Sequence, residues 1–224
     1  MQVTNLAYFY ETSKKLRGGK WVWKKDSNGE GRKNVLLGGT ILNPKKGFDH
    51  LYAAQLVQYT PAQGCLIFRS FAVKTAAAAS ATTVYINGDG YGDAPEVGML
   101  IMKAPNAAAG TGQSAVVNAV EYDETNEQFK VTLSVALGAL AQGDILVEAA
   151  GTAASAEATV LVPNPNTFVE ADRDLMPTDG YGIQNANYSI STVYDKEAWI
   201  ARMQPLPTYV LAKNRSLIDG IFWI

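Results

Sequence analysis

The sequence predicts a mostly β protein: a small β-sandwich or barrel with an extended basic N-terminal arm and a β-rich C-terminal segment. In the middle of the chain, short apolar runs are separated by Gly, Asn and Asp clusters, a pattern typical of all-β domains. The charge is unevenly distributed. Residues 1–50 hold ten Lys/Arg against four Asp/Glu, a balance of +6, whereas residues 51–224 hold nine against seventeen, a balance of −8.

The composition excludes several classes of protein. With 224 residues, of which 47% are hydrophobic, the chain is too apolar for a disordered protein and long enough to bury a core. Its one cysteine, Cys65, excludes an intramolecular disulfide framework. No apolar run reaches 18 residues, so we expect no membrane helix. The first residues lack the pattern of a secretory signal, and we therefore expect synthesis in a reducing cytoplasm.

Residues 1–64 are predicted to form a basic arm and an anchoring segment. Gly pairs and Lys runs surround Trp21 and Trp23 and leave no helical period, so we expect residues 1 to about 50 to be extended or poorly ordered in the free protein. A second extended piece covers residues 34–42. Residues 51–59 fit either a strand or one or two helical turns.

Residues 65–162 are predicted to form the β domain. Its first strand is expected at residues 65–73. Further strands are expected at residues 83–86, 99–103, 115–122, 129–135 and 145–149, with Gly, Asn and Asp turns between them. The strands at 115–122 and 129–135 should pair as a hairpin, because a single short turn cluster separates them.

Residues 163–224 are predicted to form a third segment, since Pro163 and Pro165 disfavour both helix and central strand. Residues 188–194 alternate as a strand does. Asp195 is a possible N-cap for a short helix that would run to residue 203, before Pro205.

The end of this segment is strongly apolar, and we expect it to be buried at an oligomer interface. Five of the residues from 218 to 224 are large and apolar, and free chain ends are usually polar. They are Ile218, Ile221, Phe222, Trp223 and Ile224. A last strand docked within its own subunit is the alternative.

No residue cluster in the sequence identifies a reaction. His50 is the only imidazole, and any mechanism that pairs a Ser or Cys nucleophile with His would have to use it. Cys65 opens an apolar strand and fits a small buried hydrophobe. One His and one Cys cannot form a structural zinc site.

Two further patterns have ordinary structural interpretations. Residues 87–98 partly match a calcium loop through Asn87, Asp89 and Asp93, but the fifth position is Tyr91 and the twelfth is Gly98, so we predict a turn and no metal or other cofactor. Carboxylates cluster twice, and a suitably spaced pair could serve a glycosidase, although acidic hairpin tips are common. The clusters are Glu121, Asp123, Glu124 and Glu127, and Glu170, Asp172 and Asp174.

The basic arm is the best functional signal in the sequence. Its candidate partner-binding residues are Lys14, Lys15, Arg17, Lys20, Trp21, Trp23, Lys24 and Lys25. Lys and Arg interleaved with Trp can bind nucleic acid, but phosphates would repel the acidic body of the chain. Docking onto an acidic protein surface fits better, because Trp and Arg are favoured interface anchors.

One stretch of the β domain carries a resemblance. Residues 119–133 end in the strand Val131-Thr132-Leu133, and residues 140–147 contain the strand start Gly143-Asp144-Ile145. With the arm and the apolar end, these stretches resemble auxiliary proteins of tailed-phage heads, the decoration, cement and head-fibre group. The resemblance implies a virion protein that binds capsid subunits, often as a trimer or dimer, and that has no catalytic residues.

We therefore expect a non-enzymatic structural protein of a phage particle, attached to the head through its N-terminal third. Its partner would be the capsid protein or another virion protein. One alternative is a virion-associated carbohydrate-binding protein or depolymerase with an aromatic groove and paired carboxylates. A more distant alternative is a cellular β-rich binding module.

Overall fold

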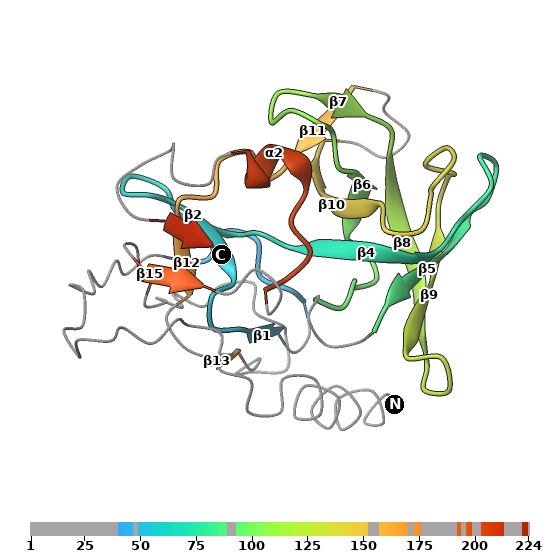
Figure 1. Cartoon of the computed structure of the whole chain (residues 1–224), viewed down its shortest axis with the longest axis horizontal. Coiled ribbons are helices and arrows are strands. Elements are labelled where there is room, and N and C mark those ends of the chain that lie inside the picture. The colour runs from blue at the N-terminus through green and yellow to red at the C-terminus, as the bar shows by residue number, and fades with distance from the viewer. Residues whose placement is uncertain are drawn as a thin grey trace. The chain divides into compact units, whose positions relative to one another are not determined.

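The fold is described from a computed structural model of the 224-residue chain. The structure describes residues 40–46, 49–88, 93–151, 157–169, 173–175, 192–193, 196–198, 203–212 and 221–223. The chain is mostly β, which confirms the predicted fold class, and it divides into two compact units (Figure 1). One unit comprises residues 69–164 and 204–212, and the other comprises the rest of the chain. No helix in the described ranges has the length and apolar character needed to cross a membrane.

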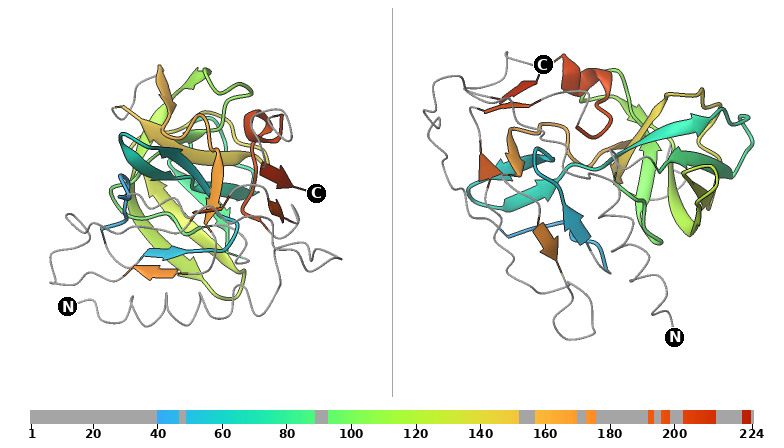
Figure 2. Two further views of the ribbon diagram at one scale, coloured as in Figure 1. Left: turned by 90° about the vertical axis from the view of Figure 1, so that its left-hand side faces the viewer. Right: turned by 60° about the horizontal axis from the view of Figure 1, so that its bottom comes forward.

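The first unit is built around a closed antiparallel barrel. Its strands are β4 (Ser70–Thr75), β5 (Thr83–Asn87), β6 (Leu100–Lys103), β8 (Ser114–Asp123), β9 (Gln128–Leu133) and β10 (Ile145–Ala150). They follow one another in the order β4-β5-β9-β8-β6-β10, and β10 pairs with β4 to complete the ring. Figure 2 shows these strands curving round a common centre. A closed ring leaves none of its six strands with a full-length free edge.

Alternating side chains fill the barrel. In β9, Phe129, Val131 and Leu133 are buried, while the residues between them are half-buried. Val84 and Ile86 alternate in the same way in β5. This period of two is the pattern from which the strands were predicted. The predicted hairpin of β8 and β9 is confirmed, with Tyr122 opposite Phe129.

Two β-bulges accompany the closure of the ring. Lys74 is an extra residue in β4 relative to β5, and Asn118 is an extra residue in β8 relative to β9. A bulge bends its strand and increases the local twist, and both help a sheet to close upon itself.

The barrel unit also includes a short C-terminal piece. We call residues 204–212 the strap, and α2 (Thr208–Leu211) is its one helical turn. The Ser70 hydroxyl donates a hydrogen bond to the Pro205 carbonyl over 2.5 Å, and the Tyr209 hydroxyl donates to the Val162 carbonyl over 3.4 Å. Burial raises the pKa of Tyr209. Beyond the ring, β11 (Ala158–Val160) pairs with the last residues of β10, and β7 (Thr111–Gly112) pairs with β11.

In the described part of the second unit the strands form three small sheets. The largest has the order β14 (Thr192–Val193), β12 (Thr167–Val169), β2 (Leu56–Thr60) and β3 (Gly64–Ile67), with antiparallel neighbours. The second pairs β1 (Asp49–Leu51) with β13 (Arg173–Leu175), and the third pairs β15 (Lys196–Ala198) with β16 (Ile221–Trp223) in parallel. Leu51, Val57, Ile67 and Val169 belong to its apolar core.

The prediction of one strand over residues 65–73 is wrong. The structure has two strands, β3 and β4, separated by Phe68 and Arg69. The Phe68 amide bonds to the Leu56 carbonyl at the end of the β2–β3 pair, and Arg69 begins the barrel unit. Apolar residues on both sides of Arg69 and Ser70 hide this break, because the sequence before and after it has the same strand-like character.

The predicted helix over residues 195–203 is also wrong. Residues 196–198 form β15, and the helical turn comes later, at Thr208–Leu211. Pro207 precedes it with φ of −69°, a value that suits the start of a helix, where a missing N–H costs nothing. Residues 51–59 likewise resolve into the end of β1, a turn and β2. Of the strand expected at 188–194, only residues 192–193 lie in the described part.

The root of the N-terminal arm is fixed to β3. The Leu42 amide donates to the Cys65 carbonyl and the Cys65 amide donates to the Thr40 carbonyl, each over 2.8 Å. Ile41 and Cys65 thereby form an isolated parallel β-bridge. Gly64 makes room for this contact, because a Cβ atom there would overlap the Thr40 carbonyl oxygen. Its φ of +116° also disfavours any other residue.

Gly64→Ala should therefore destabilise the protein more than Gly138→Ala. Gly138 also has a positive φ, +82°, but its Cβ would meet no atom within 4 Å, so that variant should lose only about 1 kcal/mol for the backbone conformation. Displacing Thr40 should add at least about 1 kcal/mol for two lost backbone hydrogen bonds. Chemical denaturation measures both values, and equal losses would contradict the proposed packing.

Candidate functional site

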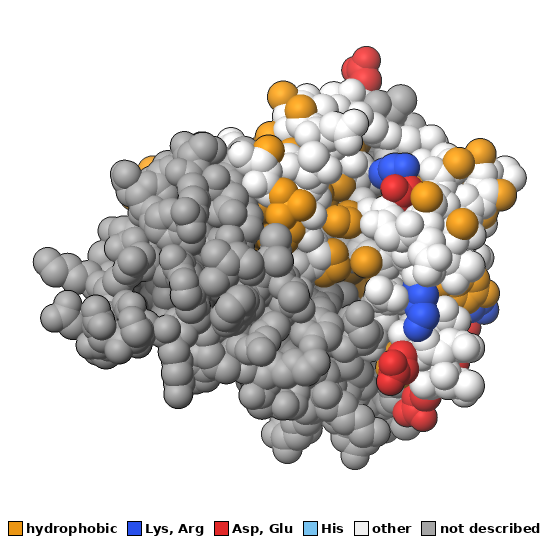
Figure 3. Space-filling model, in the orientation of Figure 1, with side chains coloured by type: hydrophobic (Ala, Val, Ile, Leu, Met, Phe, Trp, Pro, Cys, Tyr) orange, Lys and Arg blue, Asp and Glu red, His pale blue; other side chains and the backbone are white. Residues whose placement is uncertain are grey.

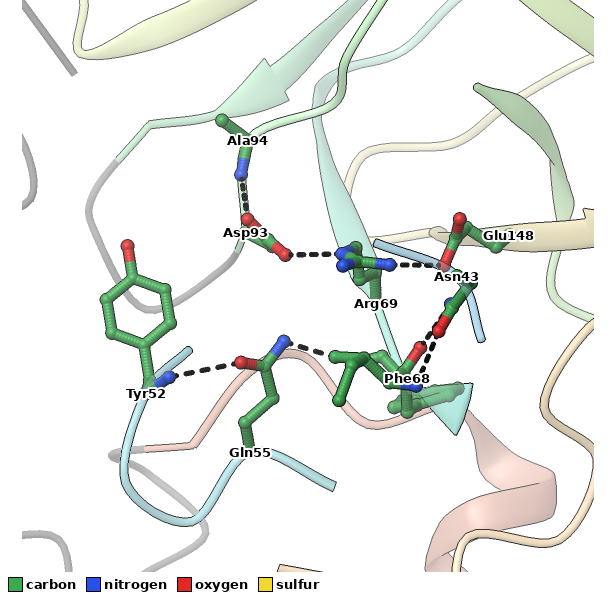
Figure 4. Close-up of polar contacts among 9 residues, drawn as sticks. Asn43, Tyr52, Gln55, Phe68, Arg69, Asp93, Ala94 and Glu148 are labelled. Atoms are coloured by element: carbon green, nitrogen blue, oxygen red, sulfur yellow. Dashed lines mark hydrogen bonds and ion pairs between the residues drawn. The ribbon is translucent and has the colours of Figure 1, made fainter. Parts of the chain in front are cut away.

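The best-defined polar cluster in the described part of the chain surrounds the buried side chain of Arg69. Its Nε lies 3.1 Å from an oxygen of Asp93, and its Nη1 donates a hydrogen bond of 3.1 Å to Glu148 (Figure 4). The Arg69 side chain is fully buried, and the carboxylates are 5% and 11% exposed. A guanidinium at this depth requires such partners, because an unpaired buried charge is very costly.

Three separate segments bring these groups together. Arg69 precedes β4, Glu148 lies in β10, and Asp93 stands at the start of the segment that leads to β6. The β4–β10 pairing puts Ser70 opposite Val147, so Arg69 and Glu148 flank the last paired residues where the barrel closes. The Asp93 contact with Nε is an ion pair rather than an aligned hydrogen bond, and the other Asp93 oxygen accepts from the Ala94 amide. The cluster thus fixes one end of the closing seam.

Arg69 is not among the functional residues that the sequence predicts. The available signal is one arginine inside the apolar run from Cys65 to Val73. A charged residue in a core strand is rare unless it is paired, so such an arginine predicts buried carboxylates. Nothing in the linear spacing of Asp93 and Glu148 identifies them as its partners.

Asp93 was also one of three candidate ligands in the calcium-like pattern of residues 87–98, and the structure shows its contacts. Its carboxylate contacts Arg69 and the Ala94 amide. Asn87 lies in β5, and Asp89 lies outside the described residues. Among the described residues, no group of three or more His, Cys, Asp or Glu side chains could hold a metal ion.

The acidic tip of the β8–β9 hairpin is held by hydrogen bonds and an ion pair. Asp123 accepts from the Asn126 amide, the Asn126 side chain and the Gln128 side chain, and these bonds lower its pKa. Glu121 forms an ion pair of 3.0 Å with Lys130, which raises the pKa of the lysine. Acidic and basic side chains lie together on this part of the surface in Figure 3. Glu121 and Asp123 therefore have structural roles within the hairpin.

The Lys74 ammonium adds a further contact to the tip. It donates to the backbone carbonyls of Asn126 and Glu127. Glu127 has a positive φ, +46°, and its carbonyl also accepts from the Gly88 amide. Lys74, the bulge residue of β4, thereby ties the hairpin turn to a strand that lies beyond β5 in the ring.

A second ion pair lies near the closing seam. Asp144 is 2.7 Å from Lys103 and accepts a hydrogen bond from the Ala141 amide. Burial alone would raise the pKa of Asp144, but these two interactions outweigh it and lower the pKa. The Asp144 carbonyl also accepts from the Val73 amide, which continues the β4–β10 pairing.

The structure places the two sequence candidates for nucleophilic chemistry in different strands. His50 lies in β1, opposite Asp174, and its ring packs edge-on against Tyr52 at 4.4 Å. Cys65 is buried in β3, and burial raises the pKa of its thiol to about 11. It therefore packs as a small hydrophobe, as predicted.

The other candidate residues lie mainly outside the described part. This holds for all eight arm residues from Lys14 to Lys25, for Ile218 and Ile224, and for Glu170 and Asp172. Ile221, Phe222 and Trp223 form β16, which pairs with β15 of the same chain. No protein-family model matches the chain, and no curated protein is significantly similar to it in sequence.

Replacing Arg69 by Met should cost about 3–5 kcal/mol of unfolding free energy, because two buried carboxylates would lose their cation. Lys130→Met is the matched control. Its partner Glu121 is 68% exposed, so that variant should lose less than about 1 kcal/mol. Urea denaturation gives both values, and a small loss for Arg69→Met would show that the cluster does not support the barrel.

Asp144→Asn should lower stability at neutral pH by about 1 kcal/mol. A carboxyl whose pKa is lowered by folding stabilises the protein above its unfolded pKa, and this contribution disappears as the pH falls through the folded pKa. The difference from the wild type should therefore vanish in acid. Thermal unfolding from pH 7 down to pH 2 tests this, and a difference that is constant with pH would contradict it.

Proposed function

We propose that the protein is a non-enzymatic structural component of a phage particle that binds the capsid through its N-terminal arm and displays the β-barrel. The observation that best supports this is the fixed root of the arm. Thr40 and Leu42 are hydrogen-bonded to β3, so the first described residues after the basic segment already belong to a folded sheet.

The charge distribution specifies the kind of surface that the arm fits. Residues 1–39 contain eight Lys/Arg and three Asp/Glu, whereas residues 69–164 contain four and ten. An acidic partner surface would attract the arm and repel the barrel, which orients the protein on its partner. Nucleic acid would also repel the barrel, and Trp21 and Trp23 add the aromatic anchors that are typical of protein interfaces.

The barrel has the properties of a displayed domain. Its ring is closed, and its interior is filled by apolar side chains. The Arg69–Glu148 ion pair lies at one end of its closing seam, and the hydrogen bond from the Val73 amide to the Asp144 carbonyl lies at the other. These features favour a stable body on the outside of a particle. The engagement of Glu121 and Asp123 within the hairpin gives no support to a paired-carboxylate glycosidase at that tip.

Co-sedimentation with intact particles in a density gradient tests the proposal. Full-length protein should travel with the particles, whereas the Trp21→Ala/Trp23→Ala variant should bind more weakly by a few kcal/mol, the order measured for buried aromatic anchors. Higher salt should weaken binding further by screening the arm. Lys130→Met, in the barrel, is the control and should bind as the wild type does.

Two outcomes would contradict the proposal. Absence of the full-length protein from the particle fractions would reject a virion role. Unchanged occupancy of the double Trp variant, with its circular dichroism spectrum intact, would show that attachment uses another surface. Release of sugar from a bacterial surface polysaccharide would instead favour the depolymerase alternative.

A further inference from the structure

The strap, residues 204–212, lies outside the core of the barrel, although it belongs to the same unit. Among the described residues, the buried side chains of that core all lie between Phe71 and Leu146, and none comes from the strap. The ring is closed by the pairing of its own strands, and α2 lies beside it (Figure 1). The ring and its core are therefore assembled without any residue of the strap.

The outer face of the closing seam is nevertheless buried. Ser70, Val147, Met102 and Ser114 lie opposite one another along β4, β10, β6 and β8. Each of them stands next to a core residue in its strand, so its side chain points away from the core. All four are at most 1% exposed. Chain from outside the ring must therefore cover this outer row.

Two hydroxyl groups anchor the strap to the barrel. At one end of the outer row, the Ser70 hydroxyl donates to the Pro205 carbonyl over 2.5 Å. From the strap itself, the Tyr209 hydroxyl donates to the Val162 carbonyl over 3.4 Å. The strap thus lies against the outer face of the seam, with one polar anchor in each direction.

The rest of the attachment is apolar and one-sided. Leu206, Tyr209 and Val210 are buried, whereas Leu211, on the same helical turn, is 38% exposed. Burying side chains of this size stabilises a contact by about 1.5–3 kcal/mol each. One side of the strap is therefore built for contact, and the other faces solvent.

The strap does not join the ring as a strand does. Pro205 and Pro207 have no N–H to donate. The amides of residues 210–212 bond to the carbonyls of residues 207 and 208, within the strap itself. A ring strand is held by a ladder of backbone bonds, whereas the strap is held by side chains, in the manner of a bound peptide.

We infer that the strap is a self-ligand, a separable peptide that occupies a binding site on the outer face of the closing seam, and that the ring keeps its fold without it. The site takes a short apolar peptide that offers a carbonyl to Ser70 and a hydroxyl to the Val162 carbonyl. The structure itself shows the occupant. The inference goes beyond the proposed function and does not depend on attachment to a particle.

The experiment supplies the strap in trans to the full-length chain. A fluorescein-labelled peptide of residues 203–213 is titrated with the Val210→Asp and Leu211→Asp variants and with the wild type. Val210 is fully buried and Leu211 is exposed, so only the first substitution places a charge in the site and expels the strap. Fluorescence anisotropy should show saturable binding to Val210→Asp. The other two proteins, whose sites hold a tethered strap, should bind at least about tenfold more weakly.

The same pair of substitutions in the peptide gives a second control. The Leu211→Asp peptide should bind the Val210→Asp protein as the wild-type peptide does, and the Val210→Asp peptide should not bind. The circular dichroism spectrum of the Val210→Asp protein should retain the β signal of the wild type, because no core residue of the ring has changed.

Three outcomes would overturn the inference. Loss of the β spectrum in the Val210→Asp protein would show that the ring requires the strap. Absence of binding between the wild-type peptide and the folded Val210→Asp protein would show that the strap is not a separable ligand. Equal binding of the peptide to the Val210→Asp and Leu211→Asp proteins would show that it binds elsewhere.

Discussion

The buried charge of Arg69 constrains much of the barrel. A guanidinium cannot lose its proton in a protein, so it must keep anionic partners wherever it is buried. Asp93 and Glu148 meet this requirement from two different parts of the chain. Their positions determine how β4, β10 and the segment before β6 come together. An apolar residue at position 69 would pack against several arrangements of these strands, whereas a buried charge accepts very few.

The ring is closed by the pairing of β4 with β10, beside the Arg69 cluster. At one end Arg69 meets Glu148, and at the other the Asp144 carbonyl accepts a hydrogen bond from the Val73 amide of β4. Between these ends the pairing covers only three residue pairs, from Ile145 to Val147. The bulges at Lys74 and Asn118 provide curvature elsewhere in the ring. A short seam is sufficient because polar contacts continue it at both ends.

The sequence predicted the strands well where local pattern decides them. β5, β8, β9 and β10 alternate or end at Gly and Asp turns, and their predicted ranges agree with the structure to within two residues. The same pattern cannot show that residues 65–73 change sheets at Phe68, since both halves remain apolar. Nor could it place the helix. Asp195 offered a cap, but pairing of residues 196–198 with β16, far along the chain, decided their conformation. The Arg69 cluster was missed for the same reason, because its partners are distant in sequence.

The division of the chain has a consequence for biosynthesis. Residues 69–164 are followed by residues 165–203 of the other unit before the strap, residues 204–212, returns to the barrel unit. A ribosome therefore releases all six strands of the ring well before the strap. It releases β12, one of the two strands paired with β2, and β13, the strand paired with β1, only after the barrel strands. β1 and β2 therefore lack these partners until all the barrel strands have been synthesised. The order of translation thus favours the barrel as the first folded part, with the flanking unit assembled last around contacts of high sequence separation.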